Sequence, residues 1–157
     1  MQGLYFWVQV SPVKALGLDV GQKTIGLAVT DDAHIAAHPI GTIARSGTAT
    51  DVSAIQTVVS ERDITDLVVG MPFELSGKIG HRARRVQQFM GVLRERLPAS
   101  LKFHEQDERF STAEATRVLL DADLSRARRK EVIDAQAAAL ILTGWLARWH
   151  AQAKSGI

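Results

Sequence analysis

Three acidic side chains stand in settings that suit metal chemistry. Asp19 interrupts the apolar run "ALGLDV", and a buried charge is costly unless it is paired or coordinates a metal ion. Glu108, with Asp107 beside it, follows the alternating segment "LKFHEQ", and Asp134 stands near the start of the helix-like stretch "EVIDAQAAALIL". Because Mg²⁺ and Mn²⁺ prefer several oxygen ligands, we expect Asp19, Asp134 and one or both of Asp107 and Glu108 to meet at one metal site.

Each acid also has an ordinary structural explanation. Asp19 lies close to a tight turn, where an aspartate caps backbone amides. Asp107 and Glu108 precede a capped helix, and Asp134 lies in the first turns of another, so all three would be stabilised by a helix N-terminus. One acid alone therefore decides little, and the metal interpretation rests on the three together.

Two nucleotide-binding interpretations of "GLDVGQKT" fit less well. A phosphate-binding P-loop needs four residues between its glycines and a lysine directly after the second. Here only residues 18–20 separate Gly17 from Gly21, and Gln22 displaces the lysine. Actin-like ATPases also place Asp-x-Gly at a strand turn, but they close two domains around the nucleotide, more than 157 residues provide.

The surrounding pattern predicts the elements that position the acids. Apolar, β-branched runs predict two antiparallel strands, "ALGLDV" and "TIGLAVTD", and a third, "IAAHPIGTIAR", which Pro39 keeps at an edge. A helix over 49–62, the strand "DLVVGMP", a helix ending before Pro98 and the strand "LKFHEQ" follow. A capping box at Ser111 and Glu114 then predicts a helix, followed by the polar connector "DADLSRARR" and a long helix over 131–150. This order predicts an α/β fold with a mixed five-stranded sheet and helices on both faces, the layout of an RNase H-like fold.

Periodicity indicates which way two of the acids point. Strand alternation puts Asp19 on the same face as Gly17, and Leu16 and Leu18 on the other face. On the last helix, Asp134 lies on one stripe with Ala138, Ile141 and Trp145. The alanines of this helix allow it to lie close to the sheet, which would bring Asp134 towards Asp19.

Composition narrows the class of protein. The chain has 157 residues, 46% of them apolar and 23% charged, which fits one globular domain with a real core. It has no cysteine, so disulfides and thiolate metal sites are excluded, and no apolar run of membrane-spanning length. We expect a cytoplasmic protein with a leader or tag-like segment at 1–14, an RNase H-like domain at 15–150 and a tail at 151–157.

Basic residues are unevenly distributed. Residues 76–102 hold seven Lys or Arg against one acid, and the run "RARRK" lies just before the helix that carries Asp134. Cations around an anionic site suit a phosphate backbone, although a solvated helix face explains them equally well from charge alone. The candidates for nucleic-acid contact are Lys23, Lys78, Arg82, Arg84, Arg85, Arg109, Arg126, Arg128, Arg129 and Lys130.

The chain resembles a known family. "GLDVGQKTIGLAVTD", "DLVVGMPFELSG", "DERFSTAEA" and "IDAQAAALIL" match, in order, the four signature blocks of the YqgF/RuvX family of RNase H-like nucleases, over about Ala15 to Trp149. The family is described as Holliday-junction resolvases and as nucleases that mature the 5′ end of 16S ribosomal RNA. The resemblance implies that Asp19, Glu108 and Asp134 are the catalytic acids.

Two positions depart from the family pattern. Many members carry Arg where this chain has Thr24, and Asn where it has Glu74. The first departure removes a possible phosphate contact, and the second adds negative charge to the loop after the fourth strand. Neither changes the three acids.

The residues and the resemblance predict the same activity, hydrolysis of phosphodiester bonds with Mg²⁺ or Mn²⁺ held by the acids. Two ions about 4 Å apart would clamp the attacking water and the leaving 3′ oxygen. The expected substrate is structured RNA, the 5′ end of pre-16S rRNA, with branched DNA as the alternative. An inactive nucleic-acid-binding module is the alternative from another class. The protein would act as a monomer or a homodimer, without contact to a membrane.

Overall fold

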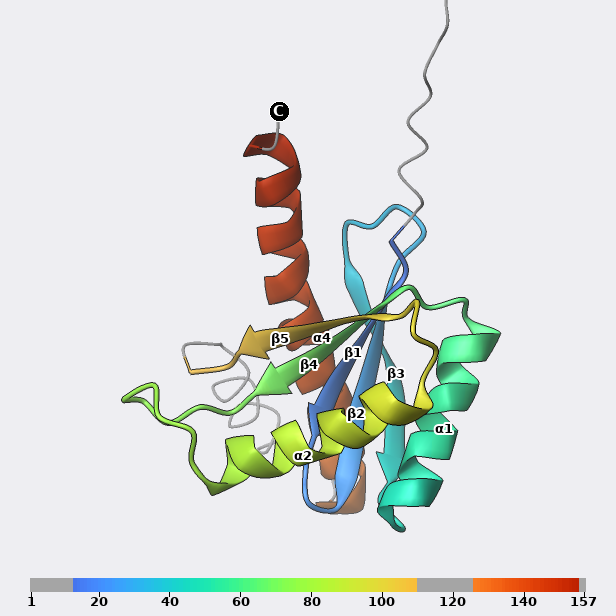
Figure 1. The fold of residues 1–157 in the computed structure, drawn as a ribbon, viewed down its shortest axis with the longest axis vertical. Helices are drawn as coiled ribbons and strands as arrows, with labels where there is room; N and C mark the ends of the chain where they lie inside the picture. The colour runs from blue at the N-terminus through green and yellow to red at the C-terminus, as the bar shows by residue number, and fades with distance from the viewer. Residues whose placement is uncertain (1–12, 110–125, 156–157) are drawn as a thin grey trace, which may run out of the picture.

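A five-stranded sheet with helices on both faces forms the centre of the molecule. The computed structural model describes residues 13–109 and 126–155. Figure 1 shows α4 behind the sheet and α1 and α2 in front of it. In chain order the elements are β1 (Ala15–Val20), β2 (Thr24–Thr30), β3 (Ala37–Ala44), α1 (Thr48–Glu61), β4 (Asp66–Met71), α2 (His81–Arg96), β5 (Lys102–Asp107) and α4 (Arg126–Ser155).

The strand order brings the carboxyl ends of three strands to one edge of the sheet. The order is β3-β2-β1-β4-β5, with β1–β2 and β2–β3 antiparallel and β1–β4 and β4–β5 parallel. The carboxyl ends of β1, β4 and β5 therefore lie at the same edge as the start of β2. We call it the acid edge, because it holds the three predicted acids.

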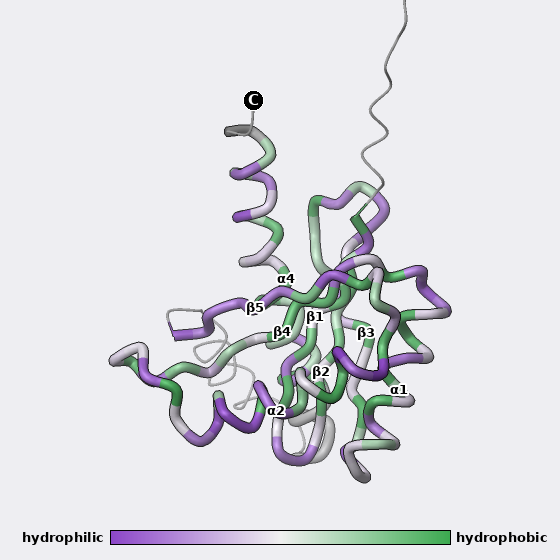
Figure 2. Tube along the Cα trace, viewed as in Figure 1, coloured by the Kyte–Doolittle hydropathy of each residue, from purple (hydrophilic) through white to green (hydrophobic). Residues whose placement is uncertain are grey.

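Side chains of different size cover the two faces of the sheet. Large residues such as Leu16 and Leu18 pack with α1 and α2, whereas small ones such as Ala15 and Ala28 pack against α4. Figure 2 shows the central strands mostly hydrophobic and the start of α2 hydrophilic. The alternation predicted for β1 is thus confirmed, and so is the α/β class with a mixed five-stranded sheet.

The last helix differs from the prediction. It begins at Arg126, so the run "RARRK" is helical. The prediction that the polar connector continues through Arg129 was therefore wrong for residues 126–129. The reason is that arginine, alanine and lysine are good helix formers, which a reading based on polarity alone misses. The helix predicted from Ser111 and Glu114 lies outside the described residues. Within residues 13–109 and 126–155, no helix has both the length and the apolar character needed to cross a membrane.

Candidate functional site: an acidic centre at the edge of the sheet

Asp19 lies on the strand at the centre of the sheet and faces α4. Its exposed fraction is only 9%, so its charge is largely removed from water. In the β1–β2 ladder it stands opposite Gly26, and cross-strand partners share a face. A Cβ on Gly26 would overlap the backbone carbonyl of Asp134. The glycine therefore lets the start of α4, with Asp134, approach the strand beside Asp19.

Glu108 approaches Asp19 from the other side. Leu18 pairs with Val69 in the parallel β1–β4 ladder, so Asp19 and Gly70 come next to each other. A Cβ on Gly70 would overlap the carboxylate of Glu108. The backbone N–H of Glu108 donates to the carbonyl of Met71 at 3.1 Å, which fixes its chain at the end of β4.

Two glycines thus flank Asp19 and each receives one of the other acids. Neighbouring strands are about 4.8 Å apart, so Gly26 and Gly70 lie about 10 Å from one another across β1. The donors are all carboxylate oxygens, the ligands that hard divalent cations prefer. Their chemistry fits Mg²⁺ or Mn²⁺, and the three acids belong to one small region although they are far apart in sequence.

The side chain of Asp134 points towards β2. Its carboxylate accepts a hydrogen bond from the hydroxyl of Thr24. Among the described residues, no three His, Asp or Glu side chains stand close enough to hold one ion. The acids are therefore neighbours, with Asp134 turned to Thr24, rather than a closed ligand shell.

Asp107 is engaged with Arg109. The Arg109 Nε donates to Asp107 Oδ2 at 2.8 Å, and the backbone N–H of Arg109 donates to Oδ1 at 2.9 Å. This hydrogen bonding from Arg109 outweighs the opposing effect of burial and holds the pKa of Asp107 below its ordinary value. The same bond raises the pKa of Arg109. Asp107 thus serves as the anchor of a guanidinium at the acid edge.

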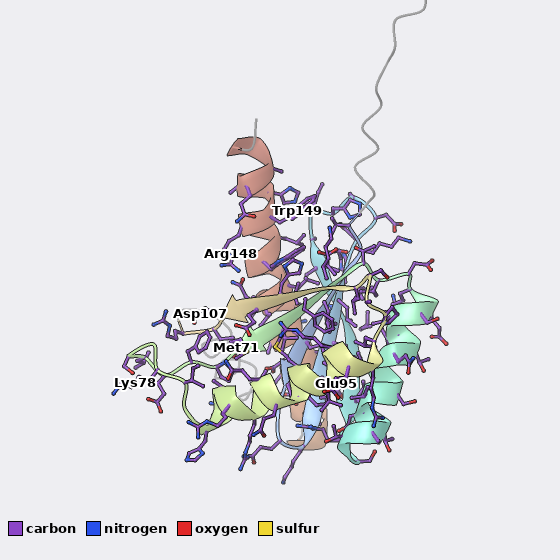
Figure 3. The ribbon with its side chains drawn as sticks, viewed as in Figure 1. Met71, Lys78, Glu95, Asp107, Arg148 and Trp149 are labelled. Carbon is purple, nitrogen blue, oxygen red and sulfur yellow. The ribbon has the colours of Figure 1, made fainter. Side chains whose placement is uncertain are left out.

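The loop between β4 and α2 places further charges near this edge. Figure 3 shows Lys78 in this loop on the same side of the molecule as Asp107. The guanidinium of Arg109 packs against Gly77, whose φ of 85° favours glycine. The side chain of Glu74 folds over Gly80, which caps α2, where an acid meets the positive end of the helix. The side chain of Glu74, one of the two departures from the family pattern, therefore covers the N-terminus of α2.

The predicted basic residues fall into two groups. The first consists of exposed side chains in the β1–β2 turn, the loop and the first turns of α2: Lys23, Lys78, Arg82, Arg84 and Arg85. The second lies in the first turns of α4, whose backbone is described but whose side chains are not: Arg126, Arg128, Arg129 and Lys130. Both groups belong to elements that end or begin at the acid edge.

Sequence reasoning missed one basic residue at this edge, Arg45. Its Nε lies 3.2 Å from Oδ2 of Asp51, which is only 1% exposed, and its Nη1 donates to the carbonyl of Gly21 at 2.9 Å. Asp51 follows Arg45 by six residues, but Arg45 comes just after β3 whereas Asp51 lies in α1, so this spacing gives no periodic signal. The one available hint was Asp51, a charged residue in the first turn of a predicted helix.

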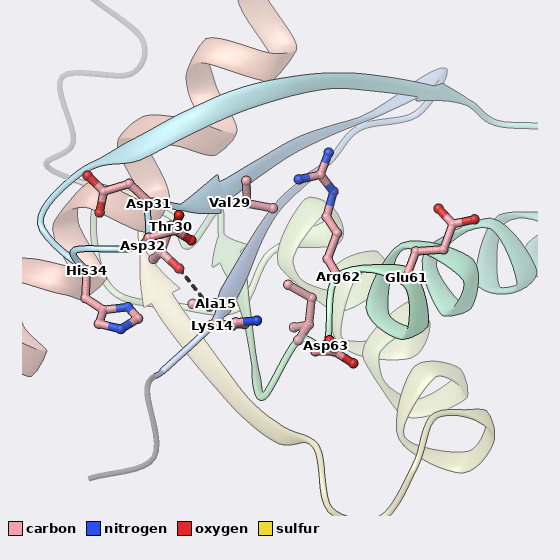
Figure 4. Close-up of a pocket in the computed structure, with 11 residues that line it drawn as sticks. Lys14, Ala15, Val29, Thr30, Asp31, Asp32, His34, Glu61, Arg62 and Asp63 are labelled. Carbon is pink, nitrogen blue, oxygen red and sulfur yellow. Dashed lines mark hydrogen bonds between the residues drawn. The ribbon is translucent and has the colours of Figure 1, made fainter. Parts of the chain in front are cut away.

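The opposite edge of the sheet carries a different set of polar groups. A pocket of about 410 Å³ lies there. Figure 4 shows Lys14, Asp31 and His34 among the residues that line it. On the same side, Nε2 of His104 lies 2.6 Å from Oδ2 of Asp66. His104 is thus a hydrogen-bond partner of Asp66. These groups lie at the far ends of β2 and β4 from the acids.

Two aromatic residues of α4 are packing residues. Trp145 is buried in the layer beneath α4, and Trp149 packs against that layer partly buried. Their ring centroids are 6.4 Å apart, and the ring of Trp145 also contacts His104 at 4.9 Å. These rings stabilise the part of α4 that lies away from the acid edge.

Comparison with known proteins places the chain in a family. The model of the family described as "RuvX: Holliday junction resolvase" matches residues 13–148. A protein of Myxococcus xanthus named "Putative pre-16S rRNA nuclease" is 45% identical over 134 residues, 85% of this chain and 87% of that protein. A protein of Moorella thermoacetica with the same name is 43% identical over 136 residues, 87% of this chain and 96% of that protein.

A solved structure shares the fold. It is RuvC of T. thermophilus in complex with a Holliday junction substrate, with a TM-score of 0.54 at 16% identity, covering 88% of this chain and 96% of that one. The likeness confirms the RNase H-like fold. The family match over most of the chain and the sequence identity to its relatives lead to one conclusion: the chain belongs to the RuvX (YqgF) family of RNase H-like nucleases.

Proposed function

We propose that the protein is a divalent-metal-dependent nuclease that processes the 5′ end of pre-16S rRNA. The observation that carries the proposal is the placement of Asp19 between two glycines, one against the backbone of Asp134 and one against the carboxylate of Glu108. The names of the relatives and the family description support the class of reaction and the substrate. This reaction belongs to the cytoplasm, where bacterial ribosomal RNA matures.

The three acids have different roles in this proposal. Asp19 is the central ligand, because it stands on the innermost strand and is held most rigidly. Glu108 and Asp134 each complete one side, and Asp134 leaves Thr24 to do so. A bound divalent cation supplies the positive charge that relieves repulsion between the acids and stabilises negative charge on the phosphate.

The chain's cations hold the substrate. Arg109, fixed by Asp107, lies next to Glu108 and is placed to steady a phosphate at the acid edge. Lys78 and the arginines in the first turns of α2 extend this positive surface along the nucleic-acid backbone, and Arg126, Arg128, Arg129 and Lys130 are further candidates for contact with it. In the reaction, water bonds to phosphorus and the bond from phosphorus to the 3′ oxygen breaks. The water gives up a proton, and the leaving 3′ oxygen takes up a proton. The products therefore carry a 5′ phosphate and a 3′ hydroxyl.

Cleavage of branched DNA is the second candidate function. It is favoured by the description of the family as a Holliday junction resolvase and by the shared fold with a resolvase. Resolution of a junction needs two coordinated cuts and therefore a dimer, whereas trimming an RNA end needs a monomer only. The mass of the protein in solution thus bears on the choice of substrate.

A single experiment tests both candidates. Labelled precursor rRNA ends and a four-way DNA junction are incubated side by side with Mg²⁺, Mn²⁺ or EDTA. We expect cleavage of the RNA with either metal, none in EDTA and none by the Asp19→Asn variant. Preferred cleavage of the junction by a dimer would favour resolution, and binding of either substrate without cleavage would indicate an inactive binding module. Cleavage that persists in EDTA would contradict the metal mechanism.

A further inference from the structure

A pocket of about 610 Å³ opens at the acid edge on the face of the sheet opposite α4. Val20, the residue after Asp19, forms part of its wall, and consecutive strand residues point to opposite faces. The pocket therefore shares the end of β1 with the acids but lies on the side of α2. Its wall combines apolar groups and cations: Val20, Pro72, Val86, Arg45, Arg82 and Arg85.

Arg45 is fixed in place before any ligand binds. Its Nε pairs with the buried carboxylate of Asp51, its Nη1 donates to the carbonyl of Gly21, and its guanidinium lies 5.0 Å from the ring centroid of Phe89. Asp51 in turn accepts a hydrogen bond from the backbone N–H of Ser46 at 3.0 Å. A guanidinium has five N–H groups, so this arrangement leaves N–H groups that can form hydrogen bonds to a phosphate in a fixed geometry.

Arg82 and Arg85 add two cations that have no acidic partner among the residues that the structure describes. They are three residues apart on α2 and so lie on one face of the helix. Within the described ranges, 13–109 and 126–155, neither forms a salt bridge. Among the described residues that line the pocket, three are arginines and none is an acid, and Asp51 lies buried behind Arg45. The pocket therefore attracts anions.

We propose that this pocket is a phosphate subsite for the nucleic-acid strand that the acids cut. A backbone phosphate would bind the three guanidinium groups, and its sugar would rest on the apolar wall of Val20 and Val86. A strand that crosses the end of β1 passes from the acids on one face to this pocket on the other. The proposal rests on the proposed nuclease function, and it assigns to Arg45, Arg82 and Arg85 the binding of a phosphate away from the cleaved bond.

Binding measured without cleavage tests the proposal. Fluorescein-labelled single strands of RNA and of DNA, with one sequence, are titrated with the protein in EDTA, and gels check that the probes stay intact. The variants are Arg82→Gln, Arg85→Gln and the double variant. Arg96→Gln is the matched control, because Arg96 has the same charge and lies on α2 about 20 Å from Arg82, given the helical rise.

The expected loss follows from counterion release. A single-strand phosphate contact adds about 0.7 to the salt slope, which corresponds to about fourfold in affinity at about 0.15 M salt relative to 1 M. Arg82→Gln and Arg85→Gln should each weaken binding by about that factor and flatten the slope, while Arg96→Gln changes neither. A larger loss of affinity for RNA than for DNA would show that the subsite prefers RNA. Equal losses would show that it recognises the phosphate alone.

Other outcomes separate this proposal from the proposed function. If the wild type cuts precursor rRNA while Arg85→Gln binds like Arg96→Gln, the subsite is refuted and the nuclease function stands. If the wild type cuts neither substrate but the arginine variants lose affinity as expected, the nuclease function fails and the pocket stands as a nucleic-acid site. Absence of binding by the wild type to either probe would overturn the subsite.

Discussion

Replacing Gly26 by alanine is a direct way to disturb the acid edge. The new Cβ would overlap the backbone carbonyl of Asp134, and it would also approach the backbone nitrogen of Ala135 at 3.1 Å. These neighbours are backbone atoms, so no side chain can rotate away and the start of α4 must shift. Overpacking of this kind costs about 1–3 kcal/mol.

The expected change in melting temperature follows from chain length. For a domain of this size, 1 kcal/mol corresponds to about 2–4 °C, so a loss of about 2 kcal/mol lowers the Tm of Gly26→Ala by about 4–8 °C. Nuclease activity should fall as well, because the displaced segment carries Asp134. Circular dichroism during heating and the cleavage assay described above measure the two effects.

Gly91→Ala is the matched control for the same chemical change. Gly91 lies in the interior of α2, and no described atom stands within 4 Å of the position of its Cβ. Alanine is preferred to glycine in a helix by about 0.5–1 kcal/mol, so this variant should melt about 1–4 °C higher, with unchanged activity. If Gly26→Ala melted at or above the wild-type temperature with full activity, the close approach of α4 to β2 would be refuted.

Two further predictions concern hydrogen bonds to carboxylates. Thr24→Val removes the hydroxyl that donates to Asp134 and should lower the free energy of unfolding by about 1–2 kcal/mol, whereas Thr24→Ser keeps the donor and should not. Unfolding by urea of the single variants, of Asp134→Asn and of the double variant measures the coupling between the two residues. Strictly additive effects would contradict this pairing. Burial acts to raise the pKa of Asp66, but hydrogen bonds from His104 and Thr65 outweigh it and the net pKa is lowered. The carboxylate therefore stabilises the fold above its unfolded pKa of about 3.9, and this contribution is lost as the pH falls through the lower folded value. Asp66→Asn should lower the Tm more at neutral pH than near pH 3, and an equal loss at both pH values would argue against it.

Much of the fold could be predicted because it follows from local sequence patterns, such as alternation in strands and helical spacing. Alternation in β1 placed Asp19 and Gly17 on one face, and Pro39 lies on the edge strand β3, where the ladder to β2 also shifts register. The stripe of Ala138, Ile141 and Trp145 is buried, as its spacing predicted.

What could not be predicted depends on contacts between distant segments. Gly26 and Gly70 are ordinary strand glycines in the sequence, and only the packed helix shows that they make room for Asp134 and Glu108. The same holds for Thr24, which is bonded to a residue 110 positions away. Arg45 was overlooked because its partners, Asp51 and Gly21, follow no period that a sequence window detects.

Manganese binding tests the central claim that Asp19, Glu108 and Asp134 form one metal site. Electron paramagnetic resonance of free Mn²⁺ can be followed while the wild type, Asp19→Asn and a control, Asp63→Asn, are added. Asp63 is exposed, and its positive φ of 52° suits asparagine. We predict that the wild type and Asp63→Asn bind Mn²⁺ equally and that Asp19→Asn loses most of the affinity. Equal binding of Mn²⁺ by all three proteins would contradict the account.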